Sequence, residues 1–279
     1  MNRTFLITGV SSGLGRAFAQ EALADGSLVV GTVRDPRHAE TFQALAPGRA
    51  VARVMDVTDD HSVATVVEDI EQTIGPIDVL ISNAGYGLEG TVEETAMDDA
   101  RRQFDVNVFG SVAVIKAVLP HMRQRRRGHI FTVSSMAGLT ALPGVAFYGA
   151  SKFAMEGIAA SLAQEVAGFG IHVTSLALGS FRTDWAGRSM VRVPRTVPDY
   201  DYLFDPIRGA RQAKDGKQAG DPARAARAVL HVLNSDKPPV HLVLGSDAVR
   251  LVEEGRRRLA DDLAAWSDLS ISTDFPTND

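Results

Sequence analysis

The chain contains no cysteine, so disulfide bonds, thiolate catalysis and cysteine ligands for a metal are all excluded. Its seven histidines show none of the spacings that metal sites use, and we expect no metal. No apolar run reaches the roughly 18 residues of a membrane span, and we expect no signal peptide, because the sequence opens directly on strand-like residues. A net charge of −5 gives no indication of a nucleic-acid partner. These absences favour a cytoplasmic protein without a membrane span.

Short apolar segments alternate with helix-length segments along most of the 279 residues, and the hydrophobic content of 45% is enough for one large core. The predicted strands are residues 4–8, 28–33, 50–55, 79–82, 129–134, 172–178 and 241–244. The predicted helices are residues 13–24, 59–74, 97–125, 151–169 and 222–233. Strands that are apolar throughout are typical of a sheet covered by helices on both faces. The pattern predicts an α/β fold with a doubly wound, seven-stranded parallel sheet of the Rossmann type, which binds ligands at the carboxyl ends of its strands.

A glycine-rich turn follows the first predicted strand. It consists of Thr8, Gly9, Val10, Ser11, Ser12, Gly13, Leu14 and Gly15. Glycines permit a tight turn and let the backbone approach a pyrophosphate closely. The helix that begins there offers free N–H groups and a positive dipole end. The turn is therefore compatible with a phosphate site, although an ordinary glycine turn would have the same sequence.

Three side chains with complementary chemistry occur at fixed spacing. Tyr148 and Lys152 are one helical turn apart, and Ser135 lies thirteen residues before the tyrosine. A free tyrosine has a pKa of about 10, and we expect the nearby ammonium to lower that of Tyr148. Tyr148 could then exchange a proton with a substrate oxygen that Ser135 holds by a hydrogen bond. The spacing selects Ser135 over Ser134, whose side chain should point the other way.

Further motifs lie at the ends of the other strands. They are Asp56-Val57 after the third strand, Asn83-Ala84-Gly85 after the fourth, and Asn107 within a predicted helix. In this order and spacing the motifs resemble those of the short-chain dehydrogenase/reductase family, and the resemblance extends from about residue 3 to residue 245. One departure is Leu178-Gly179, where the family has Pro-Gly, although the downstream Thr183 is retained.

The resemblance implies a role for each motif. Asn107, Ser135, Tyr148 and Lys152 would be the catalytic residues, and Asn107 would order a water linked to the lysine. Lys152 would also hold the nicotinamide ribose, Asp56 would bond the adenine, and Asn83 would tie neighbouring strands together. The cofactor-binding residues implied are Gly9, Ser11, Ser12, Gly13, Leu14, Gly15, Arg34, Asp56, Val57, Asn83, Ala84, Gly85, Tyr148, Lys152, Gly179 and Thr183.

The choice between NAD and NADP depends on the end of the second strand. Family members that use NAD carry an acid there, which bonds both ribose hydroxyls. In this chain Val33 occupies that place and Arg34 follows, and an arginine can pair with a 2′-phosphate. Asp35 leaves the alternative open, because a shift of one residue would make it the NAD acid. We favour NADP over NAD.

Residues 180–220 lack a clear period, and by resemblance they form a lid over the substrate cleft of a single domain that spans residues 1–245. The lid contains Trp185, Met190, Tyr200, Tyr202 and Phe204, and the preceding segment contains Leu139, Leu142, Val145 and Phe147. These side chains favour an apolar ketone, aldehyde or alcohol as substrate. Residues 246–279 are expected to form a helical extension packed on the same domain, as in steroid- and retinol-type dehydrogenases and their bacterial oxidoreductase relatives.

Two other functions remain open, a β-ketoacyl-carrier reductase and a catalytically silent nucleotide sensor on the same fold. The sensor is less favoured because the chain keeps the full set of Ser135, Tyr148 and Lys152. By resemblance we also expect a homodimer or homotetramer. Its interface would cover the apolar stripe formed by Val112, Ile115 and Leu119 on the helix of residues 97–125.

Overall fold

The computed structural model describes residues 3–185 and 187–275. The outermost parts of the predicted domain and extension, residues 1–2 and 276–279, lie outside the described residues, as does residue 186 of the lid.

Seven parallel strands form the central sheet, as the sequence predicts. They are β1 (Thr4–Thr8), β2 (Leu28–Val33), β3 (Ala50–Val54), β4 (Val79–Ser82), β6 (Gly128–Val133), β7 (Ile171–Leu178) and β9 (His241–Leu244). Their order is β3-β2-β1-β4-β6-β7-β9. Strands β2 and β3 therefore lie on one side of β1, and β4 and the later strands lie on the other. An open parallel sheet has a ligand-binding crevice at this reversal of strand order, between β1 and β4.

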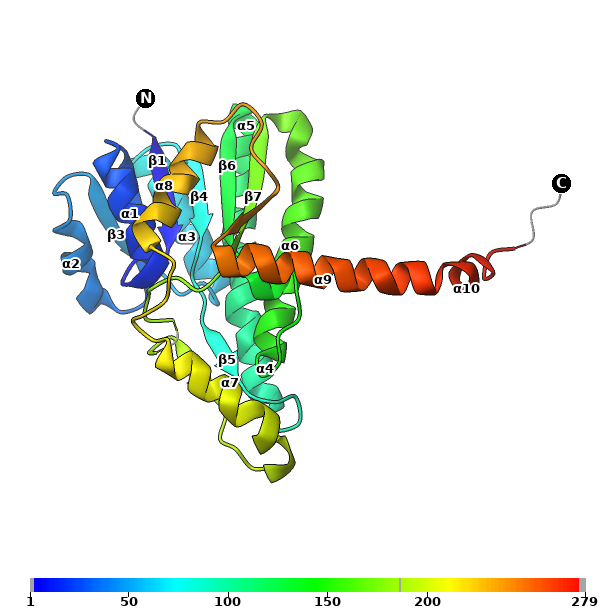
Figure 1. Cartoon of the computed structure of the whole chain (residues 1–279). Helices are drawn as coiled ribbons and strands as arrows, with labels where there is room; N and C mark the ends of the chain where they lie inside the picture. The colour runs from blue at the N-terminus through cyan, green and yellow to red at the C-terminus, as the bar shows by residue number, and fades with distance from the viewer. Residues whose placement is uncertain (1–2, 186, 276–279) are drawn as a thin grey trace.

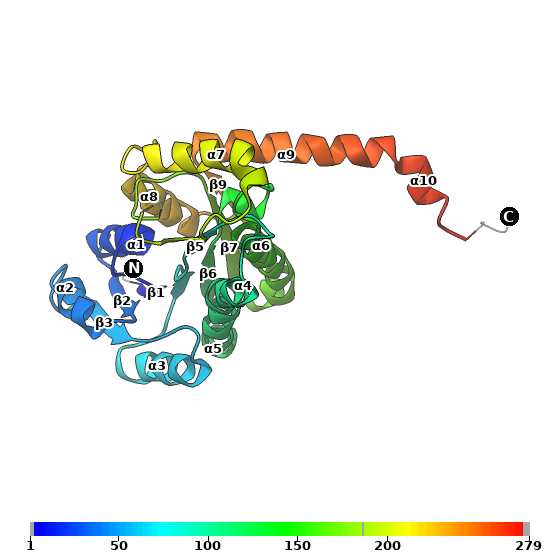
Figure 2. The same cartoon turned by 90° about the horizontal axis from the view of Figure 1, so that it is seen from below.

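Helices cover both faces of this sheet (Figure 2). They are α1 (Gly13–Ala24), α2 (Ala39–Gln43), α3 (Asp60–Thr73), α4 (Met97–Phe104), α5 (Gly110–Arg125), α6 (Ala146–Val166) and α8 (Pro222–Leu233), with short turns η1 (Pro36–His38), η3 (Met136–Gly138) and η4 (Ala167–Phe169). Successive side chains of β1 lie on opposite faces of the sheet. Phe5 and Ile7 pack in the core between the sheet and helices α1 and α8, whereas Leu6 packs in the core between the sheet and helices α3, α5 and α6. This double burial explains why the strands are apolar at every position.

The predicted helix of residues 97–125 contains an irregular turn. Between α4 and α5 the backbone forms a π turn, η2 (Asp105–Phe109), and the buried Asn107 lies within it. Such turns insert an extra residue into a helix and often occur at functional sites. Of the expected apolar stripe, Ile115 is already buried in the core of the subunit, while Val112 and Leu119 are half-buried. The prediction that an interface covers Ile115 is therefore wrong, because α3 and α5 pack against each other.

Among the described residues one helix, Met97–Arg125, is long and apolar enough by length and composition to cross a membrane. This is weak evidence for a membrane span, because a core helix of a soluble protein passes the same test. Val114, Val118 and Met122 of this helix are fully buried against the sheet and its neighbouring helices.

The lid has regular structure that the sequence did not reveal. A second, two-stranded parallel sheet joins β5 (Gly87–Glu89) to β8 (Met190–Arg192), and η5 (Pro198–Tyr200) leads into α7 (Asp201–Ala213). Figure 1 shows α7 and β5 below the carboxyl ends of the central strands. The lid thus faces the crevice of the sheet, as expected for residues 180–220.

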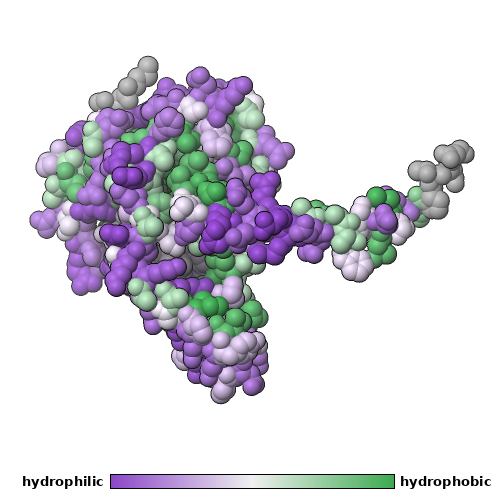
Figure 3. All heavy atoms as spheres, viewed as in Figure 1, coloured by the Kyte–Doolittle hydropathy of each residue, from purple (hydrophilic) through white to green (hydrophobic). Residues whose placement is uncertain are grey.

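The C-terminal extension departs from the prediction. The expected helix is present as α9 (Ser246–Ala265), followed by α10 (Ser267–Ile271), but only Ala248 and Val252 of α9 are fully buried. The first half of α9, up to Gly255, still contacts the body, and the outer half projects from it as an arm (Figures 1 and 3). The prediction that the whole extension packs on the domain is wrong, because the apolar side chains of the outer part have no surface of the same subunit within reach: Trp266 is 63% exposed.

Candidate active site

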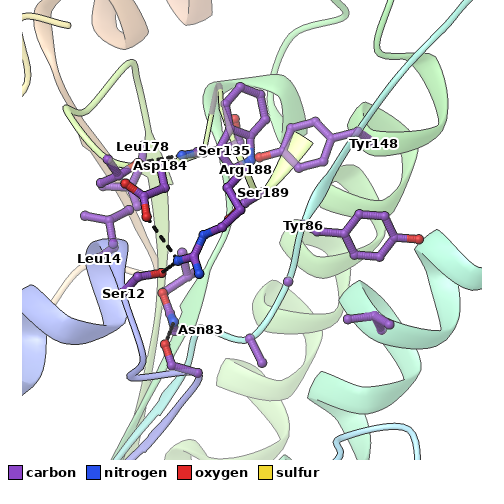
Figure 4. Close-up of a pocket in the computed structure, with 18 of the residues that line it drawn as sticks. Ser12, Leu14, Asn83, Tyr86, Ser135, Tyr148, Leu178, Asp184, Arg188 and Ser189 are labelled. Carbon is purple, nitrogen blue, oxygen red and sulfur yellow. Dashed lines mark hydrogen bonds and ion pairs between the residues drawn. The ribbon is translucent and has the colours of Figure 1, made fainter. Parts of the chain in front are cut away.

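A cleft of about 960 Å³ lies at the carboxyl ends of the central strands. The glycine-rich turn, the ends of β2, β4, β6 and β7, the start of α6 and the lid all line it. Figure 4 shows part of this lining, with Ser12 and Asn83 on one side and Ser135 and Tyr148 on the other.

The glycine-rich turn is shaped by close contacts that only glycine allows. Gly9 and Gly13 have φ angles of +73° and +60°, which are unfavourable for other residues. A Cβ on Gly15 would lie 2.3 Å from the carbonyl oxygen of Gly9, so a larger residue would push α1 away from the strand. Ser12 stands at the N-cap of α1, yet its side chain does not bond the helix. The first N–H groups of α1 are thereby left available to an anion.

Asn83 fixes this turn against the next strand. Its Nδ2 donates to the carbonyl oxygens of Thr8 (2.8 Å) and Gly9 (3.1 Å). The Oγ1 of Thr8 accepts in return from the backbone N–H groups of Asn83 (2.8 Å) and Ala84 (2.9 Å). The predicted strand-tying role of Asn83 is thus confirmed by its contacts.

Ser135 and Tyr148 meet at the floor of the cleft. Ser135 follows β6, and its Oγ accepts from the backbone N–H of Ala137 at 3.2 Å. Tyr148 lies in the first turn of α6, and Figure 4 shows its hydroxyl end directed toward Ser135. The Oγ of Ser134 is buried and has no partner among the described residues. The structure therefore distinguishes the two serines as the sequence predicts.

Lys152 lies one turn further along α6. Its Nζ donates to the carbonyl oxygen of Val133 at 2.8 Å and lies 5.8 Å from the centre of the Tyr148 ring. Asn107 approaches the same place from the π turn, since a Cβ on Gly85 would contact both the Asn107 Oδ1 and the Lys152 Nζ. The Asn107 amide exchanges two hydrogen bonds with the backbone of Tyr86, and its Nδ2 also donates to Ser151 Oγ at 3.2 Å. A water-ordering role for Asn107 stays a prediction.

Burial has the largest effect on the pKa values of Tyr148 and Lys152. It raises the pKa of Tyr148 to about 12, although the hydrogen bond from Ser135 acts in the opposite direction. Burial also lowers the pKa of Lys152 to about 8, partly offset by the carboxylate of Glu156. The expectation that Lys152 lowers the pKa of Tyr148 is therefore wrong for this state of the protein. The reason is that desolvation of a phenolate outweighs an ammonium that is itself desolvated and directed at Val133.

Comparison with known proteins agrees with this geometry. The short chain dehydrogenase family model matches residues 3–191. The chain belongs to the short-chain dehydrogenase family. Oxidoreductase BOA17 of Botryotinia fuckeliana is 38% identical over 98% of this chain and 100% of its own length. Human retinol dehydrogenase 8 is 36% identical over 85% of this chain and 80% of its own length.

Solved structures show the same relationship. A short-chain dehydrogenase from Streptomyces avermitilis superposes with a TM-score of 0.92 at 36% identity and covers 98% of both chains. Among the solved neighbours of this chain one holds NAD and another holds NADP. As a member of this family of named oxidoreductases and dehydrogenases, the protein is an oxidoreductase.

The family's proline after the sixth central strand is replaced here by a different restraint. The backbone N–H of Ser180 donates to Asp247 Oδ2 at 2.9 Å, and a Cβ on Gly179 would lie 2.1 Å from Asp247 Oδ1. Asp247 lies at the start of α9, so the C-terminal helix holds this short-chain dehydrogenase's loop after β7. Leu178 can therefore replace the proline without freeing the loop.

The strand end that selects the nucleotide has a second arginine that sequence reasoning missed. Asp35 accepts from the backbone N–H of Arg37 at 2.9 Å and forms an ion pair with its guanidinium. These bonds lower the pKa of Asp35 to about 2. Arg34 lines the cleft beside Asp56, whose pKa is lowered chiefly by the hydrogen bond from the backbone of Thr58. The carboxylate of Asp35 is thus already engaged by its own chain.

The cleft brings most of the predicted residues together. Those that line it are Gly9, Ser11, Ser12, Gly13, Leu14, Arg34, Asp56, Val57, Asn83, Ala84, Gly85, Ser135, Tyr148, Lys152, Gly179 and Thr183. Gly15 and Asn107 lie behind its wall, where they hold the turn and the π turn in place.

The substrate end of the cleft was predicted less well. Of the expected apolar side chains, Leu142, Val145 and Trp185 line it. The expected Leu139, Phe147, Met190, Tyr200, Tyr202 and Phe204 are not part of its described lining. Tyr86, Leu88, Arg188, Val191 and Ile207 line the cleft without having been predicted. No sequence signal marked them, because β5, β8 and α7 bring them there only through tertiary pairing.

Proposed function

We propose that this oxidoreductase uses NADP to interconvert an apolar ketone or aldehyde with the corresponding alcohol. The adjacent side chains of Ser135 and Tyr148, which line the cleft between a phosphate cradle and an apolar wall, carry this proposal. A bound nicotinamide dinucleotide would supply or accept the hydride, and the protein would supply position and the proton.

The residues present fit such a cofactor. The space beside Gly9 and Gly15 is closed to any side chain, and the N–H groups at the start of α1 face the cleft. The turn can therefore hold a pyrophosphate, and Lys152 lies where a ribose hydroxyl could be bound.

In this proposal Tyr148 is the residue that transfers the proton. Because its pKa is raised to about 12, it is protonated at neutral pH and suited to donate to a developing alkoxide. Ser135 would hold the same oxygen by a second hydrogen bond as its negative charge grows. Lys152 would stabilise the phenolate that Tyr148 leaves behind, since its ammonium lies over the ring face.

The end of β2 supports NADP rather than NAD. Arg34 lines the cleft at the place where a 2′-phosphate would lie, and it can make a bidentate pair with such a group. Asp35 also lines the cleft, but its carboxylate is paired with Arg37. The ribose hydroxyls of NAD would have to compete with Arg37 for this carboxylate.

Apolar side chains from four elements support an apolar substrate. Leu88, Val145, Trp185 and Ile207 line the substrate end of the cleft, and the Trp185 ring lies 5.2 Å from the Tyr148 ring. The name of human retinol dehydrogenase 8 indicates that this relative acts on retinol, an apolar alcohol.

Screening is the direct test of the whole proposal. Ketones, aldehydes and alcohols of increasing chain length are incubated with NADPH or NADP, and with NADH or NAD, while the absorbance of the reduced nicotinamide is followed. We expect turnover with NADP(H) that rises with apolar chain length. Turnover with only NAD(H), or only with substrates bearing a carrier group, would contradict the proposal.

We also propose that the protein is cytoplasmic and forms at least a homodimer through the face of η2 and α6. Phe109 (62% exposed) and Phe153 (45% exposed) are apolar side chains on these elements that an interface would cover. Light scattering at micromolar concentration should give at least twice the mass of one chain, and cell fractionation tests the location.

A further inference from the structure

The lid contains a tight turn next to the cofactor end of the cleft. This lid turn consists of residues 184, 185 and 187–189. Its backbone is closed by hydrogen bonds from Gly187 N (3.2 Å) and Ser189 N (3.0 Å) to the carbonyl oxygen of Asp184. The carbonyl of Ser189 accepts from Gly87 N at 2.9 Å, next to the pairing of β8 with β5. These hydrogen bonds close the lid turn and connect it to the strand pair of β5 and β8.

Two side chains of the lid turn reach opposite ends of the site. The Trp185 ring packs against the ring of Tyr148 at 5.2 Å between centres. Arg188 reaches the glycine-rich turn, where its Nη2 donates to Ser12 Oγ at 2.8 Å and to Asp184 Oδ2 at 3.0 Å (Figure 4). The lid turn thus connects the catalytic tyrosine to the phosphate cradle.

The contact between Arg188 and Ser12 replaces an ordinary helix cap. Ser12 is the N-cap residue of α1, but its hydroxyl accepts from Arg188 and makes no cap bond. A guanidinium therefore stands next to the free N–H groups that begin a helix of 12 residues. The other described basic residues of the cleft belong to other parts of it: Arg34 follows β2, His38 lies in η1, Arg102 in α4, Lys152 in α6, and Arg211 and Lys214 at the end of α7.

The present partners of Arg188 hold it only weakly. The Arg188 and Asp184 side chains are 61% and 55% exposed, so their ion pair contributes little to stability. A pyrophosphate in the cradle would offer the same guanidinium two adjacent anionic oxygens in the bidentate geometry that arginine prefers. Exchange of Asp184 for a phosphate is therefore favourable when the dinucleotide is bound.

We propose that Arg188 is a cofactor-binding residue that pairs with the pyrophosphate of the dinucleotide and thereby seats the lid turn, with Trp185, against Tyr148. The inference rests on the proposed use of a nicotinamide dinucleotide. It adds a contact from the lid to the cradle, so cofactor binding stabilises one wall of the substrate pocket before substrate arrives.

The test compares Arg188→Gln with Arg16→Gln, a matched control. Arg16 follows the same glycine-rich turn, but it contacts the carbonyl of Thr41 and is not part of the described cleft lining. NADPH and NADH binding are measured by the fluorescence of the reduced nicotinamide. We expect Arg188→Gln to weaken both nucleotides by about 10- to 100-fold, the range for a hydrogen bond to a charged group. Arg16→Gln should leave both affinities within about twofold.

Hydrogen exchange gives a second readout that needs no turnover. NADPH should slow amide exchange in residues 187–192 of the wild type, and this protection should be lost in Arg188→Gln. Asp184→Asn should tighten NADPH binding a fewfold, because the guanidinium is no longer held by a carboxylate.

Three results would overturn the proposal. They are unchanged NADPH affinity in Arg188→Gln, protection of residues 187–192 that survives this substitution, or an Asp184→Asn variant weakened as much as Arg188→Gln. If the wild type binds neither NADPH nor NADH, the proposed function itself fails. That outcome is distinguishable, because the other results all require a wild type that binds.

Discussion

The two halves of the active site are built by different kinds of interaction. In the nucleotide half, backbone geometry fixes the side chains: Gly9 and Gly13 adopt positive φ angles, and Asn83 bonds the carbonyls of Thr8 and Gly9. The lid is instead held in place by buried carboxylates that form ion pairs with its arginines. Glu89 is fully buried and bonds Arg208 and Arg211, at 2.9 and 3.2 Å.

A second buried carboxylate repeats the arrangement of the lid. Glu94 accepts from Arg195 and from the backbone N–H groups of Thr196 and Val197. These hydrogen bonds offset the burial of Glu94 and hold its pKa at about 2. The lid therefore depends on pairs more than 100 positions apart, whereas the nucleotide half depends on short motifs. Loss of one ion pair should open the lid while leaving the phosphate cradle intact.

The largest expected effect separates chemistry from binding. Tyr148→Phe removes the transferable proton, and we expect kcat to fall by about 10²–10⁴-fold while NADPH affinity stays nearly unchanged. Tyr202→Phe, at an 82% exposed lid tyrosine, is the control and should be neutral. Retention of more than about a tenth of kcat would mean that Tyr148 is not the acid.

Breaking the lid's buried charge should have the next largest effect. Glu89→Gln leaves Arg208 and Arg211 without their carboxylate, and the loss of one partner of a buried pair costs about 3–5 kcal/mol. We expect faster hydrogen exchange in α7 and a higher KM for substrate, with NADPH affinity little changed.

The control for this substitution is Glu254→Gln, which removes an exposed pair with Arg250 on α9. It should change stability by no more than about 0.5 kcal/mol. Equal protection of α7 in the Glu89 variant and the wild type would show that the lid does not depend on this cluster.

The next prediction concerns the nucleotide half of the site and its preference for NADPH or NADH. Arg34→Ala should weaken NADPH by about 10- to 100-fold and leave NADH nearly unchanged, because only the 2′-phosphate contact is lost. Titration of both nucleotides checks this. An equal loss of affinity for both nucleotides, or a wild type that prefers NADH, would show that Asp35 rather than Arg34 determines the cofactor preference.

The smallest effect concerns stability. The folded-state pKa of Lys152 is about 8 against 10.5 for the free side chain, so its buried charge destabilises the fold at neutral pH. Lys152→Met should therefore raise the free energy of unfolding at pH 7 by about 1–3 kcal/mol, even though activity is lost.

The pH dependence gives the sign of this effect. Between pH 8 and 10.5 the unfolded chain binds more protons at Lys152 than the folded protein, so wild-type stability rises with pH and the advantage of Lys152→Met shrinks. From pH 10 upward the raised pKa of Tyr148 acts in the opposite direction. Urea unfolding of both proteins across this range checks the prediction, which is wrong if the variant is less stable at pH 7.

The sequence could predict those parts of the site in which neighbours along the chain are also neighbours in space. Ser135, Tyr148 and Lys152 lie on a strand end and the helix whose order the motifs establish. The failures arise where distance along the chain matters. Arg188 reaches Ser12 across 176 positions, a contact with no periodic signature. The contact of Arg37 with Asp35 is local, but it depends on side-chain geometry at the η1 turn that the residue pattern does not encode.

The sequence by itself determined the seven-stranded sheet, the glycine-rich turn and the grouping of Ser135, Tyr148 and Lys152, because the spacing of hydrophobic residues, glycine φ angles and motif spacing are local properties. Only the tertiary structure decided which residues wall the substrate end, which way α9 leaves the body, and whether burial or the nearby ammonium sets the pKa of Tyr148. Each of these depends on packing or desolvation by segments distant in the chain, and no local pattern encodes them.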